Sequence, residues 1–205
     1  MNSAATSAPP GQTDVRQHIL DVAYPLFLHK GFTAVGLAEV LAAARVPKGS
    51  FYHYFGSKEA FGEAVIDEYF TVYLGQVDAL LNAPGSAAQR LLSYFRFWLE
   101  SQTGAEAQSR CLMVKLGAEV CDLSDSMRGA LERGTRGVTE RLARCIAQGQ
   151  ADGSLPGVAA AQPWDSAVLL YQTWLGASLL AKISRQRGPL DTALAATRQL
   201  LGIAV

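Results

Sequence analysis

Apolar residues return every three or four positions along most of the 205-residue chain, the spacing that places them on one face of a helix. No stretch shows the sustained alternation of apolar and polar residues that is typical of a strand. The pattern therefore predicts an all-α protein of about nine helices. One short helix is expected around Leu37, Val40 and Leu41, and the others at about residues 14–30, 48–55, 58–82, 86–102, 110–121, 124–152, 161–185 and 189–202.

The breaks between these helices carry residues that stop helices. Gly31 follows the first helix, Pro84 and Gly85 follow the fourth, and a loop occupies 152–157. Pro25 lies inside the first predicted helix, where it is expected to kink the helix or remove part of its hydrogen bonding. The buried face of that helix is expected to hold Ile19, Ala23, Leu26 and Phe27.

The segment 33–61 predicts two short helices joined by a tight turn. The turn falls near Pro47, which lacks an amide proton and biases the preceding residue away from helical angles. Pro47 is expected to be the first residue of the second helix. In that helix Phe51 and Phe55 recur four positions apart as an apolar anchor, and the other face is polar, cationic and aromatic. This is typical of a helix-turn-helix unit, whose second helix enters the major groove of DNA.

The same stretch resembles the DNA-binding domain of the TetR family of bacterial repressors. The resemblance is carried by G-F-T at 31–33, V-P-K-G-S-F-Y-H-Y-F at 46–55 and S-K-E-A-F at 57–61. It implies that the residues matching the family's DNA-contacting positions bind phosphates or base edges. These are Thr33, Gly36, Lys48, Gly49, Ser50, Tyr52, His53, Tyr54 and Lys58. For Tyr52, His53 and Tyr54, packing between helices is an alternative role.

Residues 1–12 are small and polar with prolines, and they are expected to be a disordered tail. The resemblance implies that 13–60 is a three-helix helix-turn-helix DNA-binding domain and 61–205 a helical ligand-sensing and dimerisation domain. Members of this family bind operator DNA as homodimers whose last two long helices pair across the dimer axis. Suitable residues are present here: Trp164, Val168, Tyr171, Leu175, Gly176, Ala177, Ser178, Leu179 and Ile183. Filling the core of a single chain is the alternative role for the same residues.

Charge and composition change this picture little. Lysine and arginine number 18, as do aspartate and glutamate, so the formal net charge is zero and any nucleic-acid binding must come from a local patch. The polar tail lacks the features of a signal peptide, and no stretch approaches the length of a membrane span, so we expect a cytoplasmic protein with no membrane partner. Its three cysteines are then expected to be thiols.

Cys111 is the most suggestive of these cysteines. It follows Arg110 near the predicted start of a helix, with Lys115 one turn later. Free helix-terminal amides and nearby cations favour the thiolate, the form that reacts with electrophiles and oxidants. A small buried hydrophobe is the alternative. Cys121 and Cys145 fall deeper in amphipathic helices, where a buried, inert thiol is the expected state.

Two further stretches narrow the resemblance. C-L-M-V-K-L-G-A-E-V-C-D-L-S-D-S-M-R at 111–128 and W-L-G-A-S-L-L-A-K-I-S-R at 174–185 resemble the electrophile-sensing subgroup of the TetR family, the repressors of N-ethylmaleimide reductase. That subgroup releases detoxification genes after cysteine modification, and Cys111 matches its main sensing cysteine. Lys182, set among apolar residues, is a candidate for a sulfur–nitrogen link to oxidised Cys111; the alternative is that its ammonium group extends to water.

An alternative within the same fold is release by a non-covalent small organic effector, acrylate-like or aromatic. Its pocket is expected to be lined by Tyr94, Trp98, Met113 and Trp174. An enzyme is the alternative from a different functional class, and the sequence does not support it. There is no glycine-rich phosphate loop, no C-x-x-C pair, and no clustered histidines for a metal. No cofactor is expected.

Overall fold

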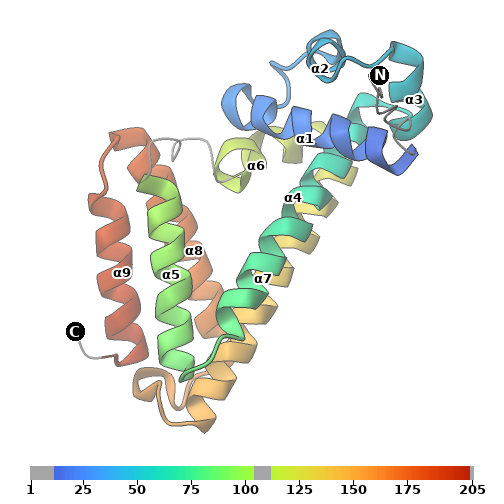
Figure 1. Cartoon of the computed structure of the whole chain (residues 1–205). Helices are drawn as coiled ribbons and strands as arrows, with labels where there is room; N and C mark the ends of the chain where they lie inside the picture. Colours follow the sequence, from blue (N-terminus) through green and yellow to red (C-terminus); the bar gives the residue numbers. More distant parts are fainter. Residues whose placement is uncertain (1–11, 104–111, 204–205) are drawn as a thin grey trace, which may run out of the picture.

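A computed structural model describes residues 12–103 and 112–203, and within these ranges the chain forms nine α-helices and no strand. The all-α prediction is confirmed. Figure 1 shows three N-terminal helices gathered at one end of the long helix α4 (Lys58–Leu81), with α6 (Leu112–Leu123) beside α1 (Gln12–Lys30), α7 (Asp125–Ala151) alongside α4, and the other later helices packed together in the rest of the chain. Of the tail expected at 1–12, residues 1–11 lie outside the described part of the chain, and Gln12 already belongs to α1.

The first helix, α1 (Gln12–Lys30), includes Pro25 and continues past it to the end that was predicted. Gly31 follows with a φ of +93°, a left-handed conformation that glycine adopts without strain. Its N–H donates to the carbonyl of Phe27 at 2.9 Å, which closes the last turn. Of the expected buried face, Leu26 is only half-buried; Leu20 and Leu28 are buried in addition.

The turn between α2 (Leu37–Ala44) and α3 (Lys48–Phe55) is formed by backbone hydrogen bonds. Arg45 takes a left-handed conformation, and the Val46 N–H donates to the Leu41 carbonyl at 3.1 Å. Pro47 has extended angles and caps α3 from outside. The expectation that Pro47 is the first helical residue is therefore wrong by one position, because its ψ of 151° is not helical.

Aromatic rings hold the three N-terminal helices to the start of α4. Phe61 of α4 lies 5.7 Å from Phe27 of α1, 5.0 Å from Phe51 and 4.8 Å from Phe55, all measured between ring centroids. These edge-on contacts are the favoured geometry for aromatic pairs. The apolar anchor predicted for α3 thus fixes that helix and leaves its opposite face outward.

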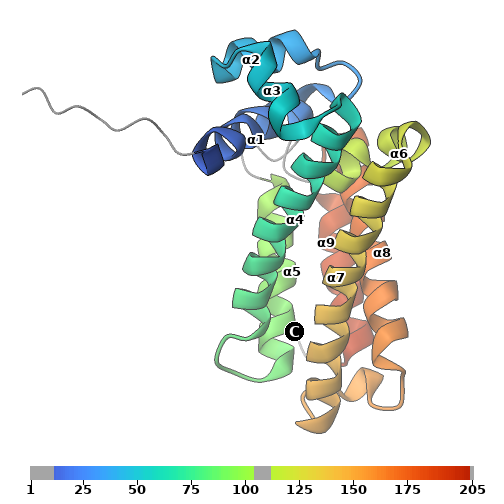
Figure 2. The same ribbon diagram turned by 90° about the vertical axis from the view of Figure 1, so that its right-hand side faces the viewer.

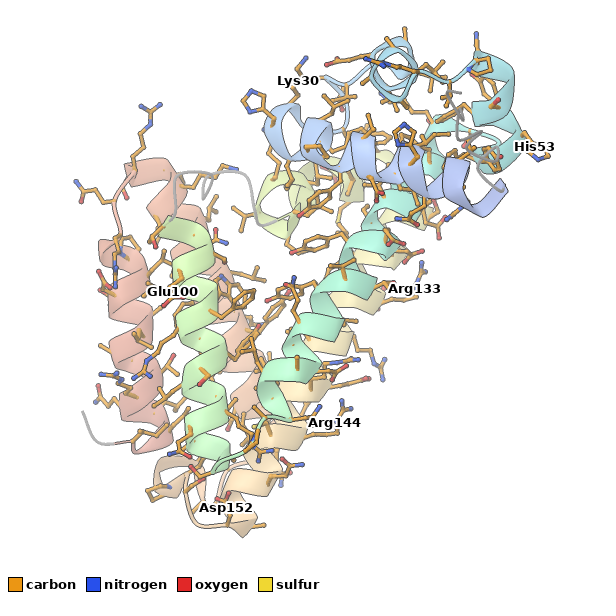
Figure 3. The ribbon with its side chains drawn as sticks, in the orientation of Figure 1. Lys30, His53, Glu100, Arg133, Arg144 and Asp152 are labelled. Carbon is orange, nitrogen blue, oxygen red and sulfur yellow. The ribbon has the colours of Figure 1, made fainter. Side chains whose placement is uncertain are left out.

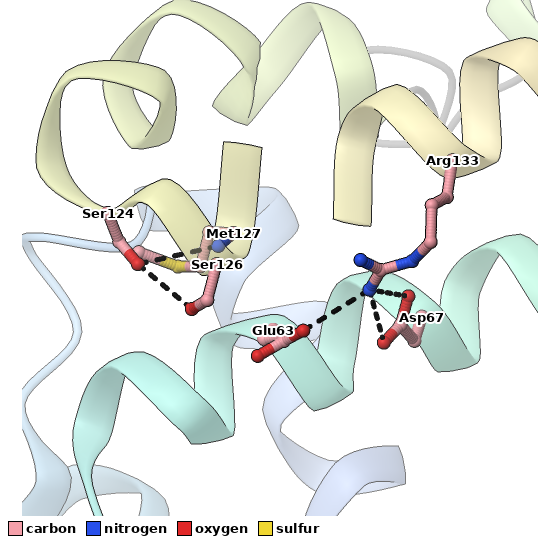
Figure 4. A network of polar contacts seen from close by, with 6 residues as sticks. All are labelled: Glu63, Asp67, Ser124, Ser126, Met127 and Arg133. Atoms are coloured by element: carbon pink, nitrogen blue, oxygen red, sulfur yellow. Dashed lines mark hydrogen bonds and ion pairs between the residues drawn. The ribbon is translucent and has the colours of Figure 1, made fainter. Parts of the chain in front are cut away.

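Helix α7 (Asp125–Ala151) lies against α4, and the two run in parallel in both Figure 1 and Figure 2. Gly134 permits this approach, because a Cβ there would lie 2.1 Å from the Phe70 ring. Ion pairs tie the same helices together. Arg133 donates to Asp67 at 3.0 Å and to Glu63 at 3.2 Å, as Figure 4 shows, and Arg141 binds both oxygens of Asp78 at 2.8 Å.

The remaining helices are α5 (Ala87–Thr103), α6 (Leu112–Leu123), α8 (Pro163–Ser184) and α9 (Gly188–Leu201). Two indole N–H groups in their core are paired with hydroxyl groups, while the buried Nε atoms of Arg90 and Arg198 have no hydrogen-bond partner among the described residues. Trp98 donates its indole N–H to Ser178 at 3.0 Å, and Trp174 donates to Thr197 at 2.9 Å. The loop predicted after α7 contains the short 3₁₀ helix η2 (Pro156–Val158).

Candidate nucleic-acid interface

The outward face of α3 carries the polar, cationic and aromatic groups that the sequence placed there. Lys48, Gly49 and His53 are exposed, and Tyr52 retains 46% of its accessible surface. Figure 3 shows His53 projecting outward from α3, away from the rest of the molecule. Ser50 is half-buried. A helix with one aromatic face packed and this face free suits the major groove.

Two of the predicted phosphate ligands lie over aromatic rings. The Lys48 ammonium is 5.8 Å from the centroid of the Tyr52 ring, and the Lys58 ammonium is 4.8 Å from that of Phe32. Attraction to the ring face restrains a long, flexible lysine without neutralising its charge. Both cations are therefore partly oriented before any phosphate arrives.

Tyr54 differs from its neighbours on α3. It is half-buried, and its ring packs edge-on against His53 at 5.0 Å and Phe55 at 6.3 Å. This environment supports the packing role that the sequence left open. Gly36 precedes the first residue of α2, has extended backbone angles and is exposed. Any contact that it makes with DNA would therefore come from its backbone.

Thr33 is exposed just before α2, and its backbone is bound by a side chain from α6, in the C-terminal part of the chain. Its N–H donates to Glu119 of α6 at 2.7 Å, and the N–H of Phe32 donates to the same carboxylate at 3.2 Å. Burial alone would raise the pKa of Glu119, but the hydrogen bonds from Thr33 and Phe32, with nearby Lys115, outweigh burial and lower it. Nothing in the amphipathic pattern around residue 119 predicts this contact.

A cavity of about 950 Å³ lies among α1, α4, α5, α6 and α8. Trp98 and Met113 line it, as the sequence predicted. Much of the remaining wall comes from α1 and α4, elements to which the sequence analysis assigned no pocket. These residues include Asp21, Tyr24, Glu68, Tyr69, Tyr73 and Gln76. On α4, Tyr69, Tyr73 and Gln76 recur every three or four positions and so share one face of the helix, which is the signal that could have revealed them.

Tyr94 and Trp174 do not line this cavity, because both are fully buried in the core beside it. Tyr94 shares a hydrogen bond with Tyr73, whose hydroxyl is 3.1 Å away, and Trp174 stacks on Phe95. Burial first, and then the neighbouring Tyr73, hold the pKa of Tyr94 well above its usual value. It is therefore a neutral hydrogen-bonding group that supports the wall from behind.

The candidate sensing residues are described only in part. Cys111 lies outside the described residues. Cys121, expected to be buried, is exposed on the outer side of α6. Cys145 is buried as expected, its thiol 3.8 Å from the Ala87 carbonyl, and burial raises its pKa to about 11. Lys182 is half-buried in the last turn of α8.

Five of the eight large apolar side chains that are exposed in the described residues lie on α8. Ile183 keeps 70% of its surface, Leu180 57% and Leu169 50%, and Trp164 and Leu179 are also exposed. Tyr171, Ala177 and Ser178 instead face the chain's own core. The structure thus separates two sets of residues that the sequence could not.

Other classes of site are not indicated in the described ranges. No group of three histidine, cysteine, aspartate or glutamate side chains there could hold a metal ion. The helices described are also too short or too polar to cross a membrane.

A helix-turn-helix unit on a long connecting helix, followed by a separate helical bundle, defines a DNA-binding transcription regulator of the all-α type. Comparison with known families agrees in detail. Residues 19–65 match the model of bacterial regulatory proteins of the tetR family, and residues 87–197 match a tetracyclin repressor-like C-terminal domain. The chain belongs to the TetR family.

Several characterised relatives span nearly the same length. The chain is 43% identical to the HTH-type transcriptional repressor NemR of Escherichia coli (strain K12), over 92% of this chain and 94% of that protein. It is 36% identical to the repressor DhaR of Mycobacterium sp. (strain GP1), over 88% of each. The crystal structure of reduced E. coli NemR superposes with a TM-score of 0.88, at 42% identity, covering 94% of this chain and 99% of that one.

Proposed function

We propose that this protein is a dimeric repressor that binds operator DNA through α3 and is released when an electrophile or oxidant modifies Cys111, which opens detoxification genes to transcription. The exposed face of α3, with Lys48 and Tyr52 arranged over a packed aromatic base, carries the DNA-binding part. The similar proteins NemR and DhaR are repressors, which supports repression rather than activation. Release through a cysteine rests on the likeness to NemR and on the chemistry of Cys111.

The exposed apolar face of α8 supports the homodimer. Five large apolar side chains along one helix are an unusual exposure for an isolated chain. Pairing α8 and α9 with the same helices of a second copy covers them around a two-fold axis. Two recognition helices then face successive major grooves about one DNA turn apart, as a two-fold operator requires.

Glu119 supplies a physical connection between the cysteine and the DNA-binding helices. It lies on α6, seven residues and about 10 Å along the helix from Leu112, which directly follows Cys111. Its carboxylate holds the backbone of Thr33 and Phe32 immediately before α2. A shift or rotation of α6 after modification therefore displaces the entrance to the helix-turn-helix unit.

A second candidate function is release by a non-covalent organic effector. The cavity of about 950 Å³ favours it, because this volume lies in the range of small-molecule sites and its wall joins α1 of the DNA-binding helices to α4, α5 and α8. A ligand there would touch both halves of the chain. Cys111 would then be inert.

The test is fluorescence anisotropy on DNA from upstream of this gene, at one fixed salt concentration. Wild type, Cys111→Ser and Cys121→Ser are titrated before and after stoichiometric N-ethylmaleimide or hypochlorite, and again after added thiol. Cys121→Ser is the matched control, because Cys121 is exposed and will also be modified. Mass spectrometry locates each adduct.

We expect wild type and Cys121→Ser to lose operator affinity by about 10- to 100-fold, a usual range for coupled sites, and to recover with thiol after hypochlorite. Cys111→Ser should keep its affinity. Release of Cys111→Ser to the same extent would exclude Cys111 as the sensor and point to another cysteine. Unchanged binding by modified wild type would remove the cysteine mechanism and leave the non-covalent effector as the remaining explanation.

A further inference from the structure

The wall of the cavity described above has an unusual combination of side chains. Six aromatic residues and two carboxylates line it, and no lysine, arginine or histidine is among its described lining residues. The carboxylates are Asp21 on α1 and Glu68 on α4. The cavity therefore combines negative charge with aromatic surface, the two features that attract an organic cation.

Three of the tyrosines form a continuous aromatic surface. The rings of Tyr24 and Tyr69 are stacked 5.9 Å apart at 18°, and those of Tyr69 and Tyr73 are 5.7 Å apart at 5°. The three near-parallel rings form a stack that passes from α1 onto α4. Trp98 and Tyr171 add a second pair of rings, 5.6 Å apart, from α5 and α8. Flat apolar molecules stack on such surfaces.

The carboxylates differ in how they are held. Asp21 is exposed and accepts a hydrogen bond from Gln17 at 3.0 Å. Glu68 is half-buried, adjoins Tyr69 in sequence, and makes no hydrogen bond or ion pair with any described residue. A partly buried carboxylate without a partner attracts a positive charge more strongly than a fully solvated one, because it is less screened. Glu68 is therefore the group that selects for charge.

We propose that this cavity binds an organic cation with a flat apolar body, such as a protonated aromatic amine. The rings contact its body, and Glu68 and Asp21 face its charge. A small carboxylate anion is disfavoured for the same reasons. The inference deepens the effector alternative and rests on it for regulatory meaning, although binding itself requires no DNA.

The experiment uses one ring system in three charge states. 9-Aminoacridine is a cation near pH 8, acridine is neutral, and acridine-9-carboxylate is an anion. Each is titrated by fluorescence into the intact protein freed of nucleic acid, since acridines also intercalate into DNA. We expect the cation to bind about tenfold more tightly than the neutral ring, within the range of cation–aromatic attraction, and the anion least tightly.

Two variants locate the selectivity. Glu68→Gln should reduce the preference for the cation over neutral acridine to near unity and leave acridine binding unchanged. Glu132→Gln makes the same charge change on the exposed face of α7 and should alter none of the three affinities. Tyr69→Leu should weaken all three ligands together, and if that variant does not fold, Glu68→Gln still decides.

Equal affinity for the cation and the neutral ring, tighter binding of the anion, or an unchanged preference in Glu68→Gln would each overturn the inference. These results are separable from the proposed function. A protein that binds operator and is released through Cys111, yet shows no cation preference, would keep the repressor mechanism and refute the cavity's selectivity. A protein that prefers the cation but does not bind operator would keep the cavity's selectivity and refute the repressor mechanism.

Discussion

The carboxylate of Glu119 accepts the backbone N–H of Thr33 at 2.7 Å, across 86 positions of sequence. Thr33 is a predicted phosphate contact, and Glu119 lies on the helix that begins beside the predicted sensing cysteine. A single side chain thus joins α6 to the backbone that precedes the helix-turn-helix unit. The contact links a predicted DNA-binding residue to α6, whose first residue follows Cys111 in the sequence.

Replacing Glu119 with alanine should reduce the effect of cysteine modification on operator affinity more than it reduces operator affinity itself. The ratio of operator dissociation constants before and after N-ethylmaleimide should shrink by up to about tenfold, since typical coupling energies are about 1–3 kcal/mol. The free energy of unfolding should fall by about 1–2 kcal/mol, because two hydrogen bonds to a partly exposed carboxylate are lost. Anisotropy titrations and urea unfolding measure the two effects. Glu132→Ala, on α7, serves as the control, and an unaltered ratio in Glu119→Ala would rule out this route.

The same carboxylate gives stability a pH dependence. The pKa of Glu119 is lowered in the folded protein, so the folded state binds this proton less readily than the unfolded state does. Its contribution is therefore complete above the ordinary value of 4.5 and is lost as pH falls through the lower folded value. Urea unfolding should find Glu119→Gln less stable than wild type at pH 7, with the difference narrowing below pH 4.5. A constant difference across that range would contradict the assignment.

Lys48 should act on DNA affinity through charge alone. Lys48→Ala is expected to weaken binding to different operator sequences alike and to reduce the slope of log K against log salt by about one for each phosphate contact removed. Titrations at several salt concentrations measure the slope. Lys30→Ala removes an equal charge that is instead paired with Glu39 at 2.5 Å, and it should leave the slope unchanged.

Gly134 should be among the least replaceable residues of α7. Gly134→Ala places a methyl group 2.1 Å from the Phe70 ring and should destabilise the protein by about 1–3 kcal/mol, the usual cost of overpacking. Gly129→Ala on the same helix meets only an arginine nitrogen at 3.5 Å and should be neutral or slightly stabilising. Thermal unfolding of the pair gives the comparison. Similar midpoints for both variants would show that α7 can move away from α4.

Introducing charge on the outer face of α8 should yield monomers. Leu180→Asp and Ile183→Asp each place a carboxylate in a surface that pairing would bury, at a cost of several kcal/mol. Light scattering after gel filtration reports the mass. Leu123→Asp, at another exposed leucine, should remain a dimer. If the α8 variants stay dimeric, the subunits associate elsewhere.

Helix positions were predictable because they depend on local spacing and on a few helix-ending residues. Ser57 caps α4 by accepting from the Ala60 N–H at 3.0 Å, and Gly31 closes α1, both readable from the sequence. Pro25 was less useful for predicting the course of α1. Its effect depends on whether packing around α1 compensates for one missing hydrogen bond, and that information lies in other helices.

The candidate sites were predictable only where one helix supplies them. The outward face of α3 follows from the burial of Phe51 and Phe55 four positions apart. The cavity does not, since its wall combines residues from five helices, and large aromatics such as Trp174 fill a core as readily as they line a pocket. The exposure of Cys121 likewise depends on how α6 turns against its neighbours.

The pairing of α4 with α7 has a mechanical consequence. Two parallel helices joined by Arg133, Arg141 and the close contact at Gly134 resist bending better than one helix does. Helices α4 and α7 would therefore rotate together as one rigid unit. The 24 residues of α4 reach about 36 Å, and a pivot of about five degrees at the bundle end moves the other end by about 3 Å. That displacement already exceeds the tolerance of a hydrogen bond to a base edge. Under the proposed function, a small rotation of α4 and α7 would therefore be enough for an effector to weaken operator binding.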